Sequence, residues 1–418
     1  MTTCGRAGAR GKLSSVTSPS SFLVLGLAVF ACACGSKDGE RTASSAASSV
    51  QAASAGDVLP AADEGPRPAA SSSAKAAADP VVAIEAGKLT LGSTPGDRGR
   101  DPTLEPPGVV VEVGGFDIDR FLYPNDLSKP PKTGLSRAQA KAACAERGRR
   151  LCTEAEWERA CKGPSGADLY PGGPGHREVC SSDPKSCASG FGVLGMGSIR
   201  EWTASDVTAI GDAKGGAAVR GGPRAGADVE HRCAKRSPVE EGRSDDDLGF
   251  RCCGGEPSAV PFPLPKEAAP FEPATLGAEE LARIIRAVPQ LASLSGDPKF
   301  FDEAAAVREL ESRVDGGKID GYKLTTAPLA WRPALGEELV VVAVQVGVDS
   351  LVAAFHRLPD DRLRVASTLV LRKDAGPVVL AYDRSAPRRL EWSTCWGCRG
   401  ESGRVTYRDD RRVVITQE

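Results

Sequence analysis

Eight cysteines between residues 144 and 253 constrain the fold of this chain more than any other feature. They are Cys144, Cys152, Cys161, Cys180, Cys187, Cys233, Cys252 and Cys253. The segments between them are rich in Gly, Pro and Ser and show little apolar periodicity, so this region needs crosslinks to hold it together. If the chain is exported, as the N-terminal pattern described next predicts, an even number of cysteines predicts a disulfide framework. Spacing alone leaves all 105 connectivities open, and these thiols lack the Cys-x-x-Cys spacing that a metal site favours.

The N-terminal residues have the pattern of a bacterial lipoprotein signal peptide. Basic residues precede an apolar run at 22–30, which is too short for a stable membrane span. Small residues before Cys34 and Gly-Ser after it resemble a lipobox, so we expect residues 1–34 to be the signal peptide and Cys34 to carry the lipid. Acylation at Cys32 and cleavage without a lipid are the alternatives. Residues 35–80, rich in Ala and Ser, are expected to form a disordered tether.

These features predict the location of the protein and exclude one class of partner. The membrane is an expected partner through the lipid anchor, and the chain is expected to be extracytoplasmic, either periplasmic or on the outer surface of a bacterial membrane. The sequence does not choose the leaflet. A formal net charge of -2 argues against a nucleic-acid partner.

A short capped helix is predicted for residues 153–163. Thr153 and Glu156 have the spacing of a capping box, and Gly163 supplies a stop. The face expected to be buried consists of Trp157, Ala160 and Cys161. Glu158 and Arg159 are expected to face water.

Several stretches occur in the order found in a known domain family. They are EAGKLTLGS at 85–93, RRLCTEAEWERACKG at 149–163, GSIREWT at 197–203, VRGG at 219–222, RCAKR at 232–236 and LGFRC at 248–252. Together, over about residues 81–254, they resemble the formylglycine-generating enzyme family, also called sulfatase-modifying factors, whose motifs are similar to RLPTEAEWE, GNVWEWT, RGGSW and GFR. The resemblance implies an irregular α+β domain related to the C-type lectins, in which long loops pack around a small sheet and two helices.

The resemblance also implies part of the cysteine connectivity. Two disulfides of the family map onto Cys144–Cys252 and Cys161–Cys233. We pair the four remaining cysteines of this region as Cys152–Cys253 and Cys180–Cys187.

The family's chemistry is not expected here. Its enzymes oxidise a substrate cysteine to formylglycine with a copper-binding cysteine pair that lies just after the RGGSW motif. In this chain, residues 220–232 contain no cysteine, and the Ser-Trp after the two glycines is replaced by Pro223-Arg224. We therefore predict no catalytic residue, no metal ligand and no bound copper, whereas the resemblance allows calcium.

A binding role is the remaining function that the resemblance supports. The candidate ligand-binding residues form a basic set, Arg200, Arg220, Arg224, His231 and Arg232. Solvated or ion-paired arginines are the alternative interpretation. We expect a lipid-anchored binding module, with an unidentified ligand or protein partner and a non-catalytic domain. The alternative is an oxidoreductase that acts on cysteine or sulfur substrates.

The C-terminal part resembles no family that we identify. Residues 255–274 are Pro-rich and predict a linker, and residues 275–418 predict an α+β domain. Helical patterns cover 278–288 and 302–314, and seven period-two runs from 339 to 417 predict an antiparallel meander with the helices on one face. Cys395 and Cys398 are expected to form a local disulfide, with a redox pair as the alternative.

Overall fold

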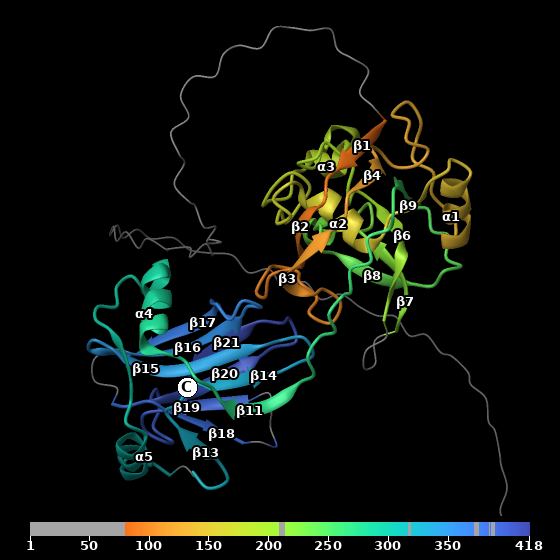
Figure 1. Cartoon of the computed structure of the whole chain (residues 1–418). Coiled ribbons are helices and arrows are strands. Elements are labelled where there is room, and N and C mark those ends of the chain that lie inside the picture. Colours follow the sequence, from red (N-terminus) through yellow and green to blue (C-terminus); the bar gives the residue numbers. More distant parts are fainter. Residues whose placement is uncertain (1–79, 209–213, 317–318, 372–375, 384, 386–388) are drawn as a thin grey trace, which may run out of the picture. The chain divides into compact units, whose positions relative to one another are not determined.

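The computed structural model describes residues 80–208, 214–316, 319–371, 376–383, 385 and 389–418. The predicted signal peptide, Cys34 and nearly all of the predicted tether lie outside these residues. All described residues fall within one compact unit of the chain. They form a mixture of helices and mostly antiparallel strands, so the predicted α+β class is confirmed (Figure 1).

Residues 81–254 contain short elements separated by long loops. The strands are β1 (Val81–Ile84), β2 (Gly87–Gly92), β3 (Pro107–Val113), β4 (Phe116–Asp119), β5 (Arg150–Leu151), β6 (Arg200–Val207), β7 (Gly216–Arg220), β8 (Arg236–Val239), β9 (Leu248–Phe250) and β10 (Cys252–Gly254). The helices are α1 (Arg137–Ala145), α2 (Glu154–Lys162) and α3 (Val179–Ser182), with short 3-10 turns at Pro184–Ser186 and Asp228–His231.

Three small sheets organise this region. One has the strand order β1-β4-β10-β5, a second is the pair β2-β3, and the third has the order β8-β7-β6-β9, in which β6 and β9 are parallel. Between the sheets, α2 packs Trp157 and Ala160 into a core with residues of β2 and β4.

Helix α2 begins as the sequence predicts but is buried on every side. Thr153 caps it, and the Thr153 and Glu156 side chains form both hydrogen bonds of the capping box. All nine residues of the helix are buried. The prediction that Glu158 and Arg159 face water is therefore wrong, because strands and loops from other parts of the chain cover this side of the helix as well.

Disulfides tie the two longer helices to the strand β10. Cys144 on α1 is bonded to Cys252, and Cys152, just before α2, is bonded to the adjacent Cys253. The other disulfides among the described cysteines are Cys161–Cys233, Cys180–Cys187 and Cys395–Cys398. These are the pairs that the sequence and the family resemblance predicted.

The remaining elements lie in residues 269–417. The strands are β11 (Ala269–Pro273), β12 (Pro298–Phe300), β13 (Lys323–Thr325), β14 (Leu329–Arg332), β15 (Leu339–Val346), β16 (Asp349–Arg357), β17 (Leu363–Leu371), β18 (Val379–Tyr382), β19 (Arg389–Ser393), β20 (Ser402–Tyr407) and β21 (Val413–Gln417). The helices are α4 (Ala278–Ala287) and α5 (Glu303–Ser312), with a 3-10 turn at Pro289–Leu291.

These strands form two sheets rather than the single meander that the sequence predicted. One sheet has the order β11-β14-β15-β16-β17, with β12 also paired to β15, and the other has the order β13-β18-β19-β20-β21. A shared core between them includes Trp331 and Val341 from the first sheet and Leu380 and Trp392 from the second. The chain passes between the two sheets three times, from β12 to β13, from β13 to β14 and from β17 to β18.

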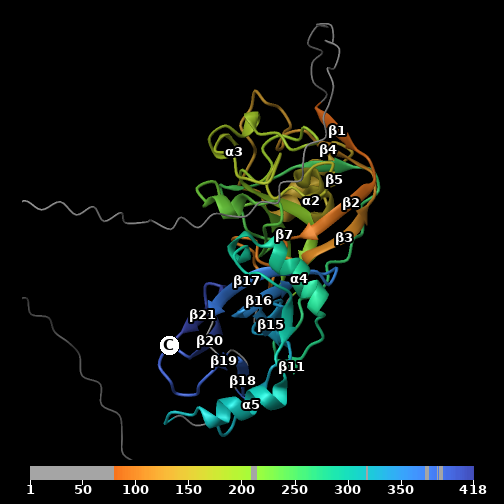
Figure 2. The same ribbon diagram turned by 90° about the vertical axis from the view of Figure 1, so that its left-hand side faces the viewer.

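The two helices cover different sheets, so the prediction that they share one face is also wrong. Helix α4 packs Leu281 and Ile285 against Val342 and its neighbours on the outer side of β15. Helix α5 packs Leu310 near Val379 of β18. Figure 1 and Figure 2 show α4 beside β15–β17 and α5 beside β13 and β18.

The Pro-rich segment after β10 is in contact with folded parts of the chain. Val260 and Phe262 pack against the core around α2, and Lys266 pairs with Glu338 at 2.8 Å. The domain limits predicted at 254 and 274 stay a prediction. No helix among the described residues is long and apolar enough to cross a bilayer.

Candidate functional site

Two carboxylates of helix α2, those of Glu154 and Glu158, are paired with arginines from β7 and β8. Arg220 Nη2 lies 2.5 Å from Glu158 Oε2, and its Nη1 lies 3.3 Å from Glu154 Oε1. Arg236 Nη2 lies 2.6 Å from Glu154 Oε2, and Lys162 Nζ lies 2.8 Å from Glu158 Oε1. The result is a buried network of alternating charges between α2, β7 and β8.

The protonation of Glu158 follows from these contacts. Burial by itself would raise the pKa of Glu158, but the Lys162 and Arg220 cations and the backbone N–H of Gly92, which donates to Glu158 at 2.7 Å, together lower the pKa below its ordinary value. The carboxylate is therefore ionised in the folded chain although no water reaches it.

Two further buried ion pairs join segments that are far apart in the sequence. Glu201 of β6 pairs with Arg251 at 2.7 Å, and Glu105 pairs with Arg232 at 2.7 Å. Each of these four side chains is at most 1% exposed. Removing one partner of such a pair costs about 3–5 kcal/mol, because the other charge stays buried without compensation.

The charged residues of the sequence motifs are therefore largely partners of one another. Glu154 and Glu158 of TEAEWE bind the arginine of VRGG and Arg236 of RCAKR, and the glutamate of REWT binds the arginine of LGFRC. Reasoning from the sequence did not identify these pairs, because helical and strand periodicity places charged residues on the solvent side. The repeated occurrence of glutamate and arginine in the motifs was the signal that could have suggested them.

The segment after β7 is compact and carries no thiol. Gly221 has a φ of +80°, and a Cβ there would lie 2.7 Å from Ile199 O. A Cβ at Gly222 would lie 2.6 Å from Glu230 O. Residues 221–232 contain no cysteine, and every cysteine among the described residues is in a disulfide.

Comparison with known proteins gives one family. The sequence profile of the sulfatase-modifying factor enzyme 1-like domain matches residues 123–254. This part of the chain is therefore similar to a sulfatase-modifying factor domain. The matched range lies within residues 81–254, over which the sequence resembles this family. The chain matches no curated protein.

Several solved structures are similar to part of the chain. PvdO from Pseudomonas aeruginosa shares 19% identity at a TM-score of 0.33, covering 41% of this chain and 93% of PvdO. Treponema denticola variable protein 1 shares 17% identity at a TM-score of 0.33, covering 41% and 94% of the two chains. CarF shares 17% identity at a TM-score of 0.32, covering 41% and 97%.

The residues of this sulfatase-modifying factor-like domain do not fit a copper ion. Cu(I) is held by soft thiolate ligands. The segment that follows Gly222 offers Pro223, Arg224 and backbone groups instead, and the sulfur atoms nearby are already oxidised in disulfides. Among the described residues, no group of three or more His, Cys, Asp or Glu side chains is arranged to hold a metal ion.

The structure does not bring the predicted ligand-binding residues together on a basic surface. Arg220 and Arg232 are fully buried in the ion pairs described above. Arg200 pairs with Asp245 at 2.8 Å and also with Asp247. Arg224 is exposed. Carboxylates from distant segments thus neutralise three of the four arginines, which a linear pattern of basic residues does not reveal.

His231, the fifth predicted residue, belongs to a small aromatic group. Its Nδ1 lies 2.7 Å from Gly197 O, and its ring stacks on His176 with centroids 5.4 Å apart. The His176 ring in turn meets the edge of Tyr170 at 5.6 Å. Burial lowers the pKa of His176, and the neighbouring His231 lowers it further. No local sequence signal pointed to His176 as part of this group.

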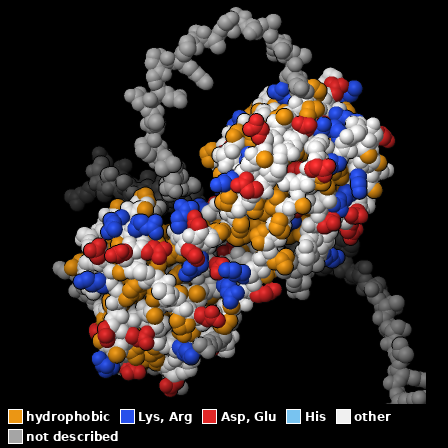
Figure 3. Space-filling view, in the orientation of Figure 1, with side chains coloured by type: hydrophobic (Ala, Val, Ile, Leu, Met, Phe, Trp, Pro, Cys, Tyr) orange, Lys and Arg blue, Asp and Glu red, His pale blue; other side chains and the backbone are white. Residues whose placement is uncertain are grey.

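The charges on the displayed face of the molecule are mixed. Figure 3 shows Lys and Arg side chains interspersed with Asp and Glu side chains over the face that it displays. This face offers no large field of one sign to attract a polyanion such as a nucleic acid.

Proposed function

We propose that the protein is an extracytoplasmic, lipid-anchored binding module whose sulfatase-modifying factor domain does not catalyse formylglycine formation. The observation that carries the proposal is the state of the cysteines. Residues 221–232, where the family resemblance places the reacting pair, contain none, and each described cysteine is in a disulfide. A disulfide sulfur is neither a nucleophile nor a thiolate ligand, so the domain lacks the groups that the family's reaction uses.

The buried charge network supports a structural role for the motifs that resemble those of the family. Glu154, Glu158, Arg220 and Arg236 neutralise one another inside the domain, and none of them is free to meet a substrate. The motifs therefore account for the fold and leave binding to other surfaces. The proposed anchor rests on the apolar run at 22–30 and the small residues around Cys34.

Counting thiols in the mature protein tests both parts of this proposal. After cleavage at Cys34 the chain retains that cysteine and the ten cysteines of the described disulfides. We expect no free thiol in the denatured, unreduced protein, because Cys34 is acylated and the others are paired. Two free thiols from the sulfatase-modifying factor domain would contradict the non-catalytic assignment. A free thiol at Cys34 alone would contradict only the anchor.

Membrane fractionation checks the anchor separately. The wild-type protein is expected in the membrane fraction, and the Cys34→Ala variant is expected in the soluble extracytoplasmic fraction. Changing Cys32 to Ala serves as the matched control and is expected to leave the protein in the membrane fraction. If the Cys34→Ala variant stays entirely with the membrane, the acylation site is wrong.

A further inference from the structure

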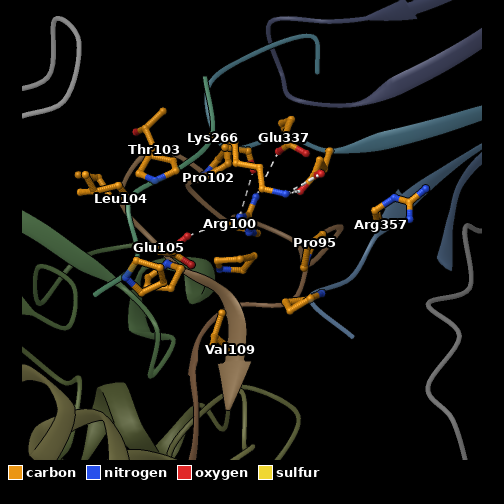
Figure 4. Close-up of a pocket in the computed structure, with 18 of the residues that line it drawn as sticks. Pro95, Arg100, Pro102, Thr103, Leu104, Glu105, Val109, Lys266, Glu337 and Arg357 are labelled. Atoms are coloured by element: carbon orange, nitrogen blue, oxygen red, sulfur yellow. Dashed lines mark hydrogen bonds and ion pairs between the residues drawn. The ribbon is translucent and has the colours of Figure 1, made fainter. Parts of the chain in front are cut away.

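A cavity of about 270 Å³ lies where four segments of the compact unit meet (Figure 4). Its walls come from residues 95–109, 263–266, 336–338 and 357–359. In Figure 4, Arg100 lies near the middle of the lining residues, with Glu105 and Glu337 on either side of it. Neither the segment 221–232 nor the His176–His231 group contributes a residue to the lining of the cavity.

Proline dominates the lining of this cavity. Seven of its nineteen lining residues are prolines, and Leu104, Val109, Leu264 and Leu358 add further apolar surface. Proline rings are rigid, and a proline has no backbone N–H. The walls are therefore apolar and stiff, and the backbone that lines them offers more hydrogen-bond acceptors than donors.

The charged residues around the cavity are already neutralised. Arg100 pairs with Glu337 at 3.3 Å, and Glu105 pairs with Arg232 at 2.7 Å. The other charged lining residues have partners of their own, namely Lys266 with Glu338 at 2.8 Å and Arg357 with Asp361 at 3.2 Å. Each charged lining residue thus has a partner of opposite charge, although Arg100 Nε is buried without a hydrogen-bond partner, and burying a further charge here would cost free energy.

The loop that forms one wall is fixed at several points. Asp97 pairs with Arg364 at 2.7 Å, Asp101 pairs with Arg411 at 3.0 Å, and Glu105 is held by Arg232. The cavity is thus preformed, so a ligand does not have to order the loop on binding. Leu264, which is 64% exposed, stands at the accessible side of the lining.

We infer that this cavity binds an uncharged, ring-containing small molecule that carries a hydrogen-bond donor. The inference rests on the proposed binding function and names the class of ligand. Rigid apolar walls favour a rigid apolar ring, since a flexible chain loses more conformational freedom on binding. The balanced charges exclude an ionic ligand, and the acceptor-rich backbone selects a donor.

Three related probes separate these requirements. Indole is neutral and has one N–H donor, N-methylindole lacks the donor, and indole-3-carboxylate is an anion. We expect indole to bind the full mature chain in calorimetry and to show saturation transfer by NMR. N-methylindole is expected to bind a few-fold more weakly, and indole-3-carboxylate about tenfold more weakly or not at all.

Two exposed apolar residues provide the variant and its control. Leu264→Asp places a charge at the cavity and is expected to weaken indole binding by about tenfold, since the ring then meets an unpaired carboxylate. Val348→Asp changes an equally exposed residue, 63% accessible, that does not line the cavity, and is expected to leave binding unchanged.

No binding of indole, equal binding of the anion, or equal loss in both variants would overturn the inference. Because none of these results involves a thiol, the thiol count on the same preparation still reports separately on the proposed function.

Discussion

The Cys144–Cys252 disulfide lies next to a second crosslink, and this arrangement sets the cost of removing it. Cys152–Cys253 joins nearly the same two segments as Cys144–Cys252, because Cys152 lies eight residues after Cys144 and Cys253 directly follows Cys252. Once Cys152–Cys253 is formed, Cys144–Cys252 closes a loop of only about ten residues. The double variant Cys144→Ala/Cys252→Ala removes this small closure, whereas Cys161→Ala/Cys233→Ala removes a larger one.

The loop-entropy relation gives the two magnitudes. A closure of about ten residues is worth about 2.7 kcal/mol. With Cys152–Cys253 in place, the Cys161–Cys233 bond closes a loop of about 29 residues, made of residues 152–161 and 233–253. This closure is worth about 3.6 kcal/mol. If each bond acted alone, the sequence separations of 108 and 72 would give about 4.8 and 4.4 kcal/mol, in the opposite order. The nested connectivity therefore predicts that losing Cys161–Cys233 destabilises the domain more than losing Cys144–Cys252, although Cys161–Cys233 has the shorter sequence separation.

Hydrogen exchange of the α2 backbone amides measures this order in the full chain. These amides are buried and report the free energy of opening the domain around them. We expect the Cys161/Cys233 variant to lose about 1 kcal/mol more than the Cys144/Cys252 variant. A Cys395→Ala/Cys398→Ala variant is the control and is expected to leave the exchange of α2 unchanged. A larger loss for Cys144/Cys252 would refute the nested connectivity.

Three further predictions concern caps and charges. Thr153→Ala removes the N-cap of α2 and is expected to cost about 1 kcal/mol in chemical denaturation, while Thr153→Ser restores most of it. Folding lowers the pKa of Glu158, so the ionised carboxylate stabilises the fold above about pH 4.5, and this stabilisation is lost as the pH falls through the folded pKa. In the Glu158→Gln variant we expect a weaker dependence of stability on acid pH. The free energy of unfolding of this variant should also fall by about 3 kcal/mol. Folding lowers the pKa of His176, so protonation of this side chain opposes folding, and the free energy of unfolding should decrease as the pH falls below about 6.5. An NMR titration that gives His176 a pKa above 6.5 would contradict the burial of its ring.

Local patterns predicted the elements whose determinants are close together in the sequence. The cap of α2, its Trp157 face and most of the strands between 339 and 417 follow from spacing alone. The disulfide pairs required the family resemblance, because eight cysteines have no unique pairing from spacing.

The buried charges could not be predicted from periodicity. Glu158 was expected to face water, and inside the domain it is compensated in part by Arg220, which lies 62 residues further along the chain. The same long-range pairing removed Arg220 and Arg232 from the predicted binding surface.

The division of the C-terminal strands into two sheets had a signal that the meander prediction did not use. The run Leu339–Val346 is apolar on both faces, as expected of a strand covered on both sides. Its alternate residues face α4 and the core between the sheets. The cavity near Arg100 had no such signal, because its four segments are spread between residues 95 and 359 of the chain.

The most direct test of the non-catalytic assignment is a peptide-oxidation assay on the full chain. The purified protein is incubated with a sulfatase-motif peptide, copper, oxygen and a reductant, and formylglycine is detected by the change in peptide mass. An active formylglycine-generating enzyme serves as the positive control. We predict no product above the level of a protein-free reaction, because residues 221–232 supply no thiolate. Formylglycine formation by this chain would contradict the account.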